Sequence, residues 1–127
     1  MSRLENRVQL IGYVGIDPEY FTFPSGDKKA TIKLATNRSS RDAKGEFVVV
    51  TDWHTIVVYG KLTEVVENFV RKGKQIGIDG KLTYRSYDAA DGSKRFLTEV
   101  ICDELILLGG GHGILTPSKE EGLTASK

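Results

Sequence analysis

The chain has 127 residues, of which 39% are hydrophobic and 28% charged, and this size and balance suit one globular domain. Eleven aromatic residues exclude a wholly disordered chain, and no apolar run approaches the roughly 20 residues of a membrane span. The only cysteine, Cys102, excludes an intramolecular disulfide, and the first seven residues lack the apolar segment of a secretory signal. A reducing intracellular compartment is therefore expected.

Positive charge is concentrated in the middle of the chain. The formal net charge is only +1, but residues 28–95 hold fourteen basic and eight acidic side chains, a local net charge of +6. Because local potential decides attraction, this segment is able to present a surface for a polyanion. The alternative is a solvated surface of mixed charge.

Three strands are predicted in the first half of the chain. Apolar residues at 8, 10 and 14 share one face of a strand over 8–14. Breaker residues at 17–18 and 24–27 predict a loop before a second strand at 30–36, and the polar stretch 37–46 predicts a long basic hairpin loop. The β-branched and aromatic residues of 47–59 predict a long third strand.

One helix and two further strands complete the prediction. Apolar residues at 62, 65, 66, 69 and 70 have helical spacing, with Arg71 and Lys72 expected in the last turn and Gly73 as the left-handed residue that ends the helix. Strands at 75–87 and 94–108 are separated by a turn at 88–92.

This order predicts an all-β fold with one short helix. A helix between the third and fourth of five strands is the layout of the OB-fold, a five-stranded Greek-key barrel that commonly binds oligonucleotides or oligosaccharides. The domain is expected over 1–108, followed by a flexible, glycine-rich C-terminal tail at 109–127. Another small α+β domain is the alternative.

Aromatic and basic residues share strand faces. The period of two places Trp53 and Tyr59 on one face of the third strand, and Arg85 and Tyr87 on the solvent face of the fourth. A single-stranded nucleic acid needs such a combination, a flat ring for each base and a cation for each phosphate. The alternative is that the aromatic rings fill the core.

Catalytic chemistry has little support. The two histidines are far apart, so no metal site or thiol–histidine pair is predicted, and His54 is expected to be packed or at an interface. The acidic residues Asp88, Asp91, Asp103 and Glu104 leave a metal-dependent nuclease on an OB barrel as an alternative, although a turn explains them more simply.

Several ungapped blocks resemble the bacterial and mitochondrial single-stranded DNA-binding protein family over about residues 6–108. They are NRVQLIG at 6–12, GIDPE at 15–19, LATN at 34–37, TDWH at 51–54, YGKLTEV at 59–65, RKG at 71–73 and RFLTEV at 95–100. The resemblance implies a homotetramer of OB-folds that wraps single-stranded DNA without sequence preference during replication, recombination and repair, with no enzymatic activity and no cofactor. The competing class is a protein-interaction, primosome-type or oligosaccharide-binding OB module.

The resemblance also implies roles for individual residues. It places base-stacking rings at Trp53, Tyr59 and Tyr87, and a histidine of the subunit contact at His54. The cations that it implies for the DNA backbone are Arg3, Arg7, Lys61, Arg71, Lys72, Arg85 and Arg95.

Two departures from the family pattern accompany this resemblance. Ser40 stands where better-known members carry a stacking tryptophan, so one ring is expected to be missing. The last residues, 123–127, lack the acidic tip through which tailed bacterial members dock partner proteins, so no such docking is expected. The expected compartment is the cytoplasm, with the nucleoid, or alternatively the mitochondrial matrix.

Overall fold

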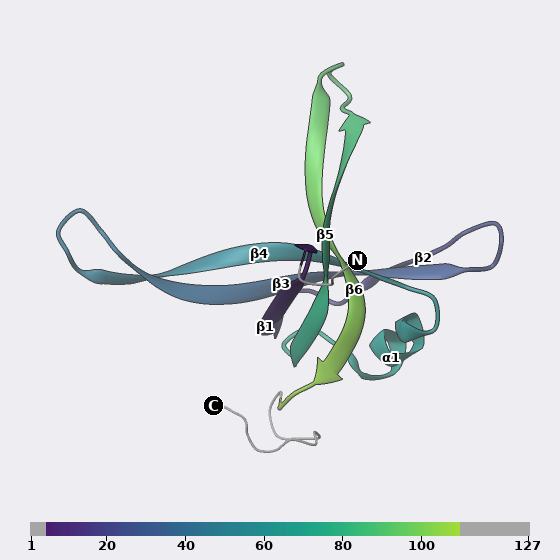
Figure 1. Ribbon diagram of the computed structural model, residues 1–127, viewed down its shortest axis with the longest axis horizontal. Helices are drawn as coiled ribbons and strands as arrows, with labels where there is room; N and C mark the ends of the chain where they lie inside the picture. The colour runs from purple at the N-terminus through teal and green to yellow at the C-terminus, as the bar shows by residue number, and fades with distance from the viewer. Residues whose placement is uncertain (1–4, 110–127) are drawn as a thin grey trace.

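The computed structural model describes residues 5–109 (Figure 1). Arg3 and the predicted tail beyond Gly109 lie outside the described residues. The elements in chain order are β1 (Val8–Val14), β2 (Glu19–Thr22), β3 (Lys28–Arg41), β4 (Phe47–Tyr59), α1 (Leu62–Phe69), β5 (Gln75–Asp88) and β6 (Lys94–Leu107).

The predicted five-stranded barrel is confirmed. Neighbouring strands run in the order β1-β5-β6-β4-β3, and a short β1–β3 pairing closes the ring. Every pairing is antiparallel except β4–β6, where only Ile56 and Val57 of β4 pair with Val100 and Ile101 of β6. The prediction of a loop through residues 17–27 missed β2, which adds a sixth strand along the edge of β3.

The core lies inside the barrel, and α1 covers one end of it. Val66 and Val70 are fully buried there, since they occupy the apolar stripe of the helix and the residue that follows it. Burial raises the pKa of the Cys102 thiol to about 12, so this side chain is a protonated core residue at neutral pH. Within residues 5–109, no helix has the length and apolarity to cross a membrane.

Two hairpins extend beyond the barrel (Figure 1). The predicted loop at 37–46 is wrong for its first half, residues 37–41, because β3 and β4 stay paired as far as Arg41 and Phe47. The turn at 42–46 is stabilised by Asp42, whose Oδ1 accepts the N–H groups of Lys44 at 2.9 Å and Glu46 at 3.0 Å, while Gly45 adopts a φ of +81°. The second hairpin is the distal half of β5 and β6.

The helix ends earlier than its apolar pattern predicts. Val70 has an extended conformation with φ −99° and ψ 121°, because its side chain turns into the core. Arg71 and Lys72 therefore follow α1 instead of standing in its last turn. Gly73 has the predicted positive φ, +90°, but uses it in the turn that leads from these cations to β5.

Candidate nucleic-acid interface

Trp53 lies on the outer face of β4 and is 61% exposed. Its ring rests on Gly15, where an added Cβ would collide with the outer edge of the indole. The Gly15 N–H donates to the Lys33 carbonyl at 2.9 Å, which fixes the glycine against β3, and small Ala35 stands directly opposite Trp53. The indole is thus supported from below and open above.

Tyr59, Arg85 and Tyr87 form a second group. Both rings are half exposed, and Tyr87 is two residues from Arg85 on the same face of β5. The pKa of Arg85 is raised by Glu99 and, to a smaller extent, by Tyr59 and Tyr87, so Tyr59 is also near this guanidinium. Arg85 donates from Nε and Nη2 to the two carboxylate oxygens of Glu99, at 3.1 and 3.3 Å. The hydrogen bond and charge of buried Glu99 raise the pKa of Arg85. Within residues 5–109 the other N–H groups of Arg85 have no partner, so they are able to donate to a ligand.

Arg95 adds a cation to this group. It pairs directly with Tyr87 across the β5–β6 ladder, so the two side chains share a face. Its guanidinium is 3.6 Å from the Asp91 carboxylate, and Nε donates to Ser93 Oγ at 3.2 Å. Both ends of the ion pair are exposed, so Arg95 is able to exchange this partner for a phosphate at little cost.

Lys61, Arg71 and Lys72 flank α1: Lys61 stands just before its first residue, and Arg71 and Lys72 follow Val70 at its other end. Lys61 precedes the helix and is exposed, and the Arg71 side chain donates to the Val70 carbonyl at 2.9 Å. The backbone N–H of Lys72 is bound by Asp17 at 2.8 Å, which leaves its exposed side chain pointing away from the barrel core. These three cations therefore lie at the two ends of α1, and not on the β5–β6 hairpin that carries Arg85 and Arg95.

Arg7 has a structural partner. Its Nε and Nη2 donate to the two carboxylate oxygens of Asp79, at 3.0 and 3.3 Å, and Asp79 is buried. A buried carboxylate needs such a counter-charge, so this fork stabilises the junction of β1 and β5. His54 is half-buried, and its Nε2 lies 2.9 Å from the hydroxyl of Thr36.

Several other exposed aromatic residues were given no DNA-binding role from the sequence. Phe47 lies on the face of Trp53, and the Arg41 guanidinium stacks over its ring at 4.1 Å. Tyr84 and Phe96 are also exposed, on the opposite face of the β5–β6 hairpin from Tyr87. Arg41 and Phe47 are opposite neighbours in the β3–β4 pairing. The sequence could have revealed this only if residues 37–41 had been recognised as a strand instead of a loop.

The acidic residues considered for a nuclease do not converge. Asp91 accepts the backbone N–H and the hydroxyl of Ser93, and these hydrogen bonds lower the pKa of its carboxyl group. Asp91 therefore shapes the turn between β5 and β6. Within residues 5–109, no three His, Cys, Asp or Glu side chains are grouped closely enough to hold a metal ion.

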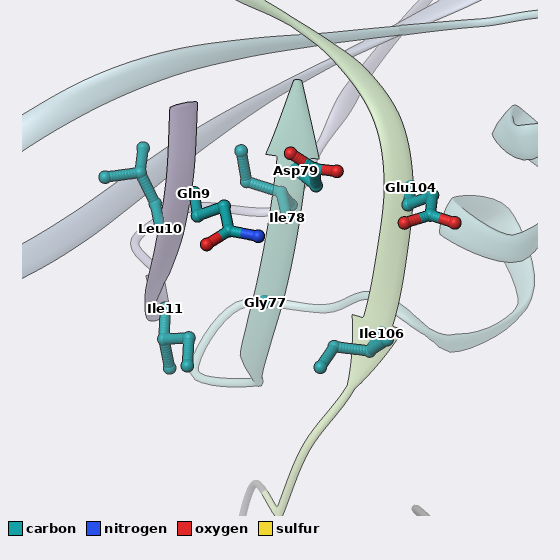
Figure 2. A pocket seen from close by; sticks show the side chains of 8 residues that line it. All are labelled: Gln9, Leu10, Ile11, Gly77, Ile78, Asp79, Glu104 and Ile106. Atoms are coloured by element: carbon teal, nitrogen blue, oxygen red, sulfur yellow. The ribbon is translucent and has the colours of Figure 1, made fainter. Parts of the chain in front are cut away.

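A shallow hollow of about 440 Å³ lies on the outer surface of β1, β5 and β6 (Figure 2). Its floor is Gly77, flanked by Ile11 and Ile106, which are 61% and 53% exposed. A Cβ on Gly77 would lie only 3.0 Å from Ile106, so the glycine makes the hollow. The lining also includes the polar side chains of Gln9, Asp79 and Glu104 but no aromatic or basic residue, which separates this surface chemically from the faces of Trp53 and Tyr59.

We predict that Gly15→Ala displaces the Trp53 ring without unfolding the barrel. The new methyl group would occupy the position of the indole edge, and an exposed ring is free to swing outward. Iodide should then quench Trp53 fluorescence more strongly than in the unchanged protein. Gly109→Ala is the matched control, since among residues 5–109 its Cβ would meet only the Gln75 side chain, at 4.0 Å; equal quenching in both variants would contradict the prediction.

Comparison with known proteins agrees with this geometry. The family described as "Single-strand binding protein family" matches residues 5–108. The chain is 38% identical to "Single-stranded DNA-binding protein 1" of Chlorobaculum tepidum over 110 residues, which cover 86% of this chain and 68% of the relative.

Solved structures with the same fold include two named single-stranded DNA-binding proteins. "Plasmodium falciparum SSB complex with ssDNA" has 37% identity and a TM-score of 0.75, covering 81% of this chain and 94% of that one. A deletion mutant of the single-stranded DNA-binding protein from Thermus aquaticus has 27% identity and a TM-score of 0.72, covering 84% of this chain and 51% of that one. The match spans nearly the whole described domain, and this chain belongs to the single-strand binding protein family.

Proposed function

We propose that this protein binds single-stranded DNA without sequence preference and shields it during replication, recombination and repair, with no catalytic step. The observation that carries the proposal is the display of aromatic rings beside cations on the outer barrel face, at Trp53, Tyr59, Arg85 and Tyr87. The Plasmodium falciparum relative is described in complex with single-stranded DNA, which supports the same ligand here. The proposed compartment is a bacterial cytoplasm or a mitochondrial matrix, where a genome is copied.

The proposed mechanism combines stacking with charge neutralisation. Every base has a π-face, so a ring such as Trp53 or Tyr87 accepts any base, and this accounts for binding without sequence preference. In a duplex the base faces are stacked on one another and unavailable to these rings. Cations such as Arg85 and Arg95 meet the phosphates, which accounts for affinity but carries no sequence information.

We propose further that the protein assembles as a homotetramer. A closed tetramer of dihedral symmetry needs two different self-complementary contacts, and the surface offers two candidates. One is the apolar face of Ile11, Gly77 and Ile106 (Figure 2). The other is the edge of β1 near Gly12, beside which Thr36 and His54 are hydrogen-bonded. These contacts would leave the faces of Trp53 and Tyr59 open to DNA.

Binding to oligo-dT should depend steeply on salt. Each phosphate neutralised on a single strand contributes a slope of about −0.7 to the plot of log affinity against log salt, so several contacts per subunit add up to a steep line. Quenching of the single tryptophan, Trp53, is the readout. Equal affinity for a duplex of the same length, or a flat salt dependence, would exclude the proposed mechanism.

Trp53→Ala should weaken binding while the fold is retained. In single-strand binding proteins, base–aromatic stacking is worth about 1–3 kcal/mol per base by alanine substitution. The measurement is the fluorescence anisotropy of labelled oligo-dT, with the melting temperature recorded in parallel. Val49→Ala is the control, because Val49 is exposed on the same face of β4 but has no ring; equal losses in both variants would refute a stacking role.

Ile106→Glu should divide the tetramer into dimers. A self-complementary contact brings the same residue of two chains together, so the substitution places two like charges in an apolar interface. Light scattering should show four chains of 14.0 kDa before the substitution and two after it. Phe96→Glu, an exposed site away from both proposed contacts, should stay tetrameric. A monomer before any substitution would rule out the tetramer.

A further inference from the structure

β2 carries an aromatic residue in line with Tyr59. Phe21 of β2 pairs with Lys29 of β3, and Lys29 pairs with Tyr59 of β4. Residues directly opposite each other in antiparallel strands point to the same face of the sheet. The two rings therefore stand on one outer face with the lysine between them. Two inter-strand steps of roughly 4.8 Å separate the Phe21 and Tyr59 backbones by about 10 Å.

The ring of Phe21 is exposed and held in position. It is 52% exposed, and Tyr59 is 47% exposed. Phe23 meets Phe21 edge-to-face, with ring centroids 4.9 Å apart and an interplanar angle of 77°. A ring that is held in one orientation and still remains exposed presents apolar surface on which a ligand is able to stack.

Lys29 is the only one of three lysines on β3 whose ammonium group has no side-chain partner in residues 5–109. Lys28 is 3.4 Å from the Glu67 carboxylate, and Lys33 donates to Thr55 Oγ1 at 2.9 Å. Lys29 makes neither kind of contact within the described residues. The aliphatic part of the Lys29 side chain lies between the rings of Phe21 and Tyr59, so its ammonium group is available above the two rings.

We propose that Phe21 and Lys29 form a nucleotide subsite that extends the DNA path from Tyr59 onto β2. A base stacks on Phe21, and the neighbouring phosphate pairs with Lys29. The inference rests on the proposed binding of single-stranded DNA at Tyr59. It gives the path a direction, toward the edge of the sheet formed by β2, on the side of the barrel opposite the β3–β4 hairpin (Figure 1).

The opposite face of β2 supplies an internal control. Tyr20 is the neighbour of Phe21 and is similarly exposed, but it pairs with Ala30 and lines a hollow with Glu67 and Arg71 near α1. Burial raises the pKa of the Tyr20 phenol, as expected for a ring that turns toward the helix and not toward the outer face. Removal of the Tyr20 ring should therefore leave the proposed DNA path over Tyr59 and Phe21 unchanged.

The first experiment compares Phe21→Ala with Tyr20→Ala in the full chain. Binding of oligo-dT of graded length is followed by Trp53 quenching, with the melting temperature of each variant. Phe21→Ala should weaken the longer oligonucleotides about 5-fold to 100-fold and leave the shortest ones unchanged, because only a longer strand reaches from Trp53 to β2. Tyr20→Ala should bind as the unchanged protein does. Equal losses in the two variants would overturn the subsite.

The second experiment isolates the phosphate contact. Lys29→Gln keeps the length and polarity of the side chain but removes its charge, and should make the salt slope shallower by about 0.7 per occupied subsite. Lys28→Gln is the control, since Lys28 is the neighbour of Lys29 on β3 and therefore lies on the opposite face of the sheet, where its ammonium group is 3.4 Å from Glu67. A salt slope unchanged by Lys29→Gln would overturn the role of Lys29.

A reporter variant tests stacking directly and does not depend on small changes in affinity. In Phe21→Trp combined with Trp53→Phe, the only tryptophan is at position 21, and saturating oligo-dT should quench it. Unchanged emission at saturation, with binding confirmed by anisotropy, would refute the subsite and leave the proposed function intact. Failure of the unchanged protein to bind oligo-dT at all would instead refute the proposed function.

Discussion

The closure of the barrel is the constraint on which the remaining structure depends. The parallel contact of β4 with β6 joins only two residues of each strand, and β1 meets β3 over two more. Only about half of each long strand therefore belongs to the closed barrel. Ile32, Leu34, Ile56 and Ile76 fill its interior, and beyond them the same strands continue as two-stranded hairpins with water on both faces.

This division accounts for the exposed rings. In a sheet packed against a second layer, the aromatic residues of one face would be buried, because burial of such a side chain stabilises a fold by roughly 1.5–3 kcal/mol. The hairpins have no second layer, so Phe47, Tyr84 and Phe96 remain in water. A base that stacks on such a ring removes apolar surface from water. Because folding leaves this surface exposed, its burial against a base is able to stabilise the proposed DNA contacts.

Rigid support for rings and cations comes from ordinary structural contacts. The Glu99 carboxylate orients Arg85, and Gly15 supports the indole of Trp53. The first contact joins the two strands of the β5–β6 hairpin, and the second joins β4 to the residue that follows β1. A net charge of only +1 does not exclude the proposed polyanion ligand, because attraction depends on local potential, and Arg85 and Arg95 remain exposed beside their acidic partners.

The sequence by itself determined the number of barrel strands, the helix and the faces of the regular strands. Periodicity is a local property, and it correctly placed Trp53 and Tyr59 opposite Ile56 and Val58. It missed β2, because four residues between Pro18 and Pro24 are too few to show a period. It also treated the paired residues 37–41 as a loop, because a hairpin exposed on both faces needs no apolar pattern.

Only the tertiary structure decided which side chains meet across strands. The end of α1 depends on Val70, whose burial in the barrel stops the helix before Arg71, and the helical pattern alone contains no sign of this. The row of Phe21, Lys29 and Tyr59 depends on the register of three strands. Register is set by how the sheet closes around its core, and that is a property of the whole chain, so no local pattern of residues contains it.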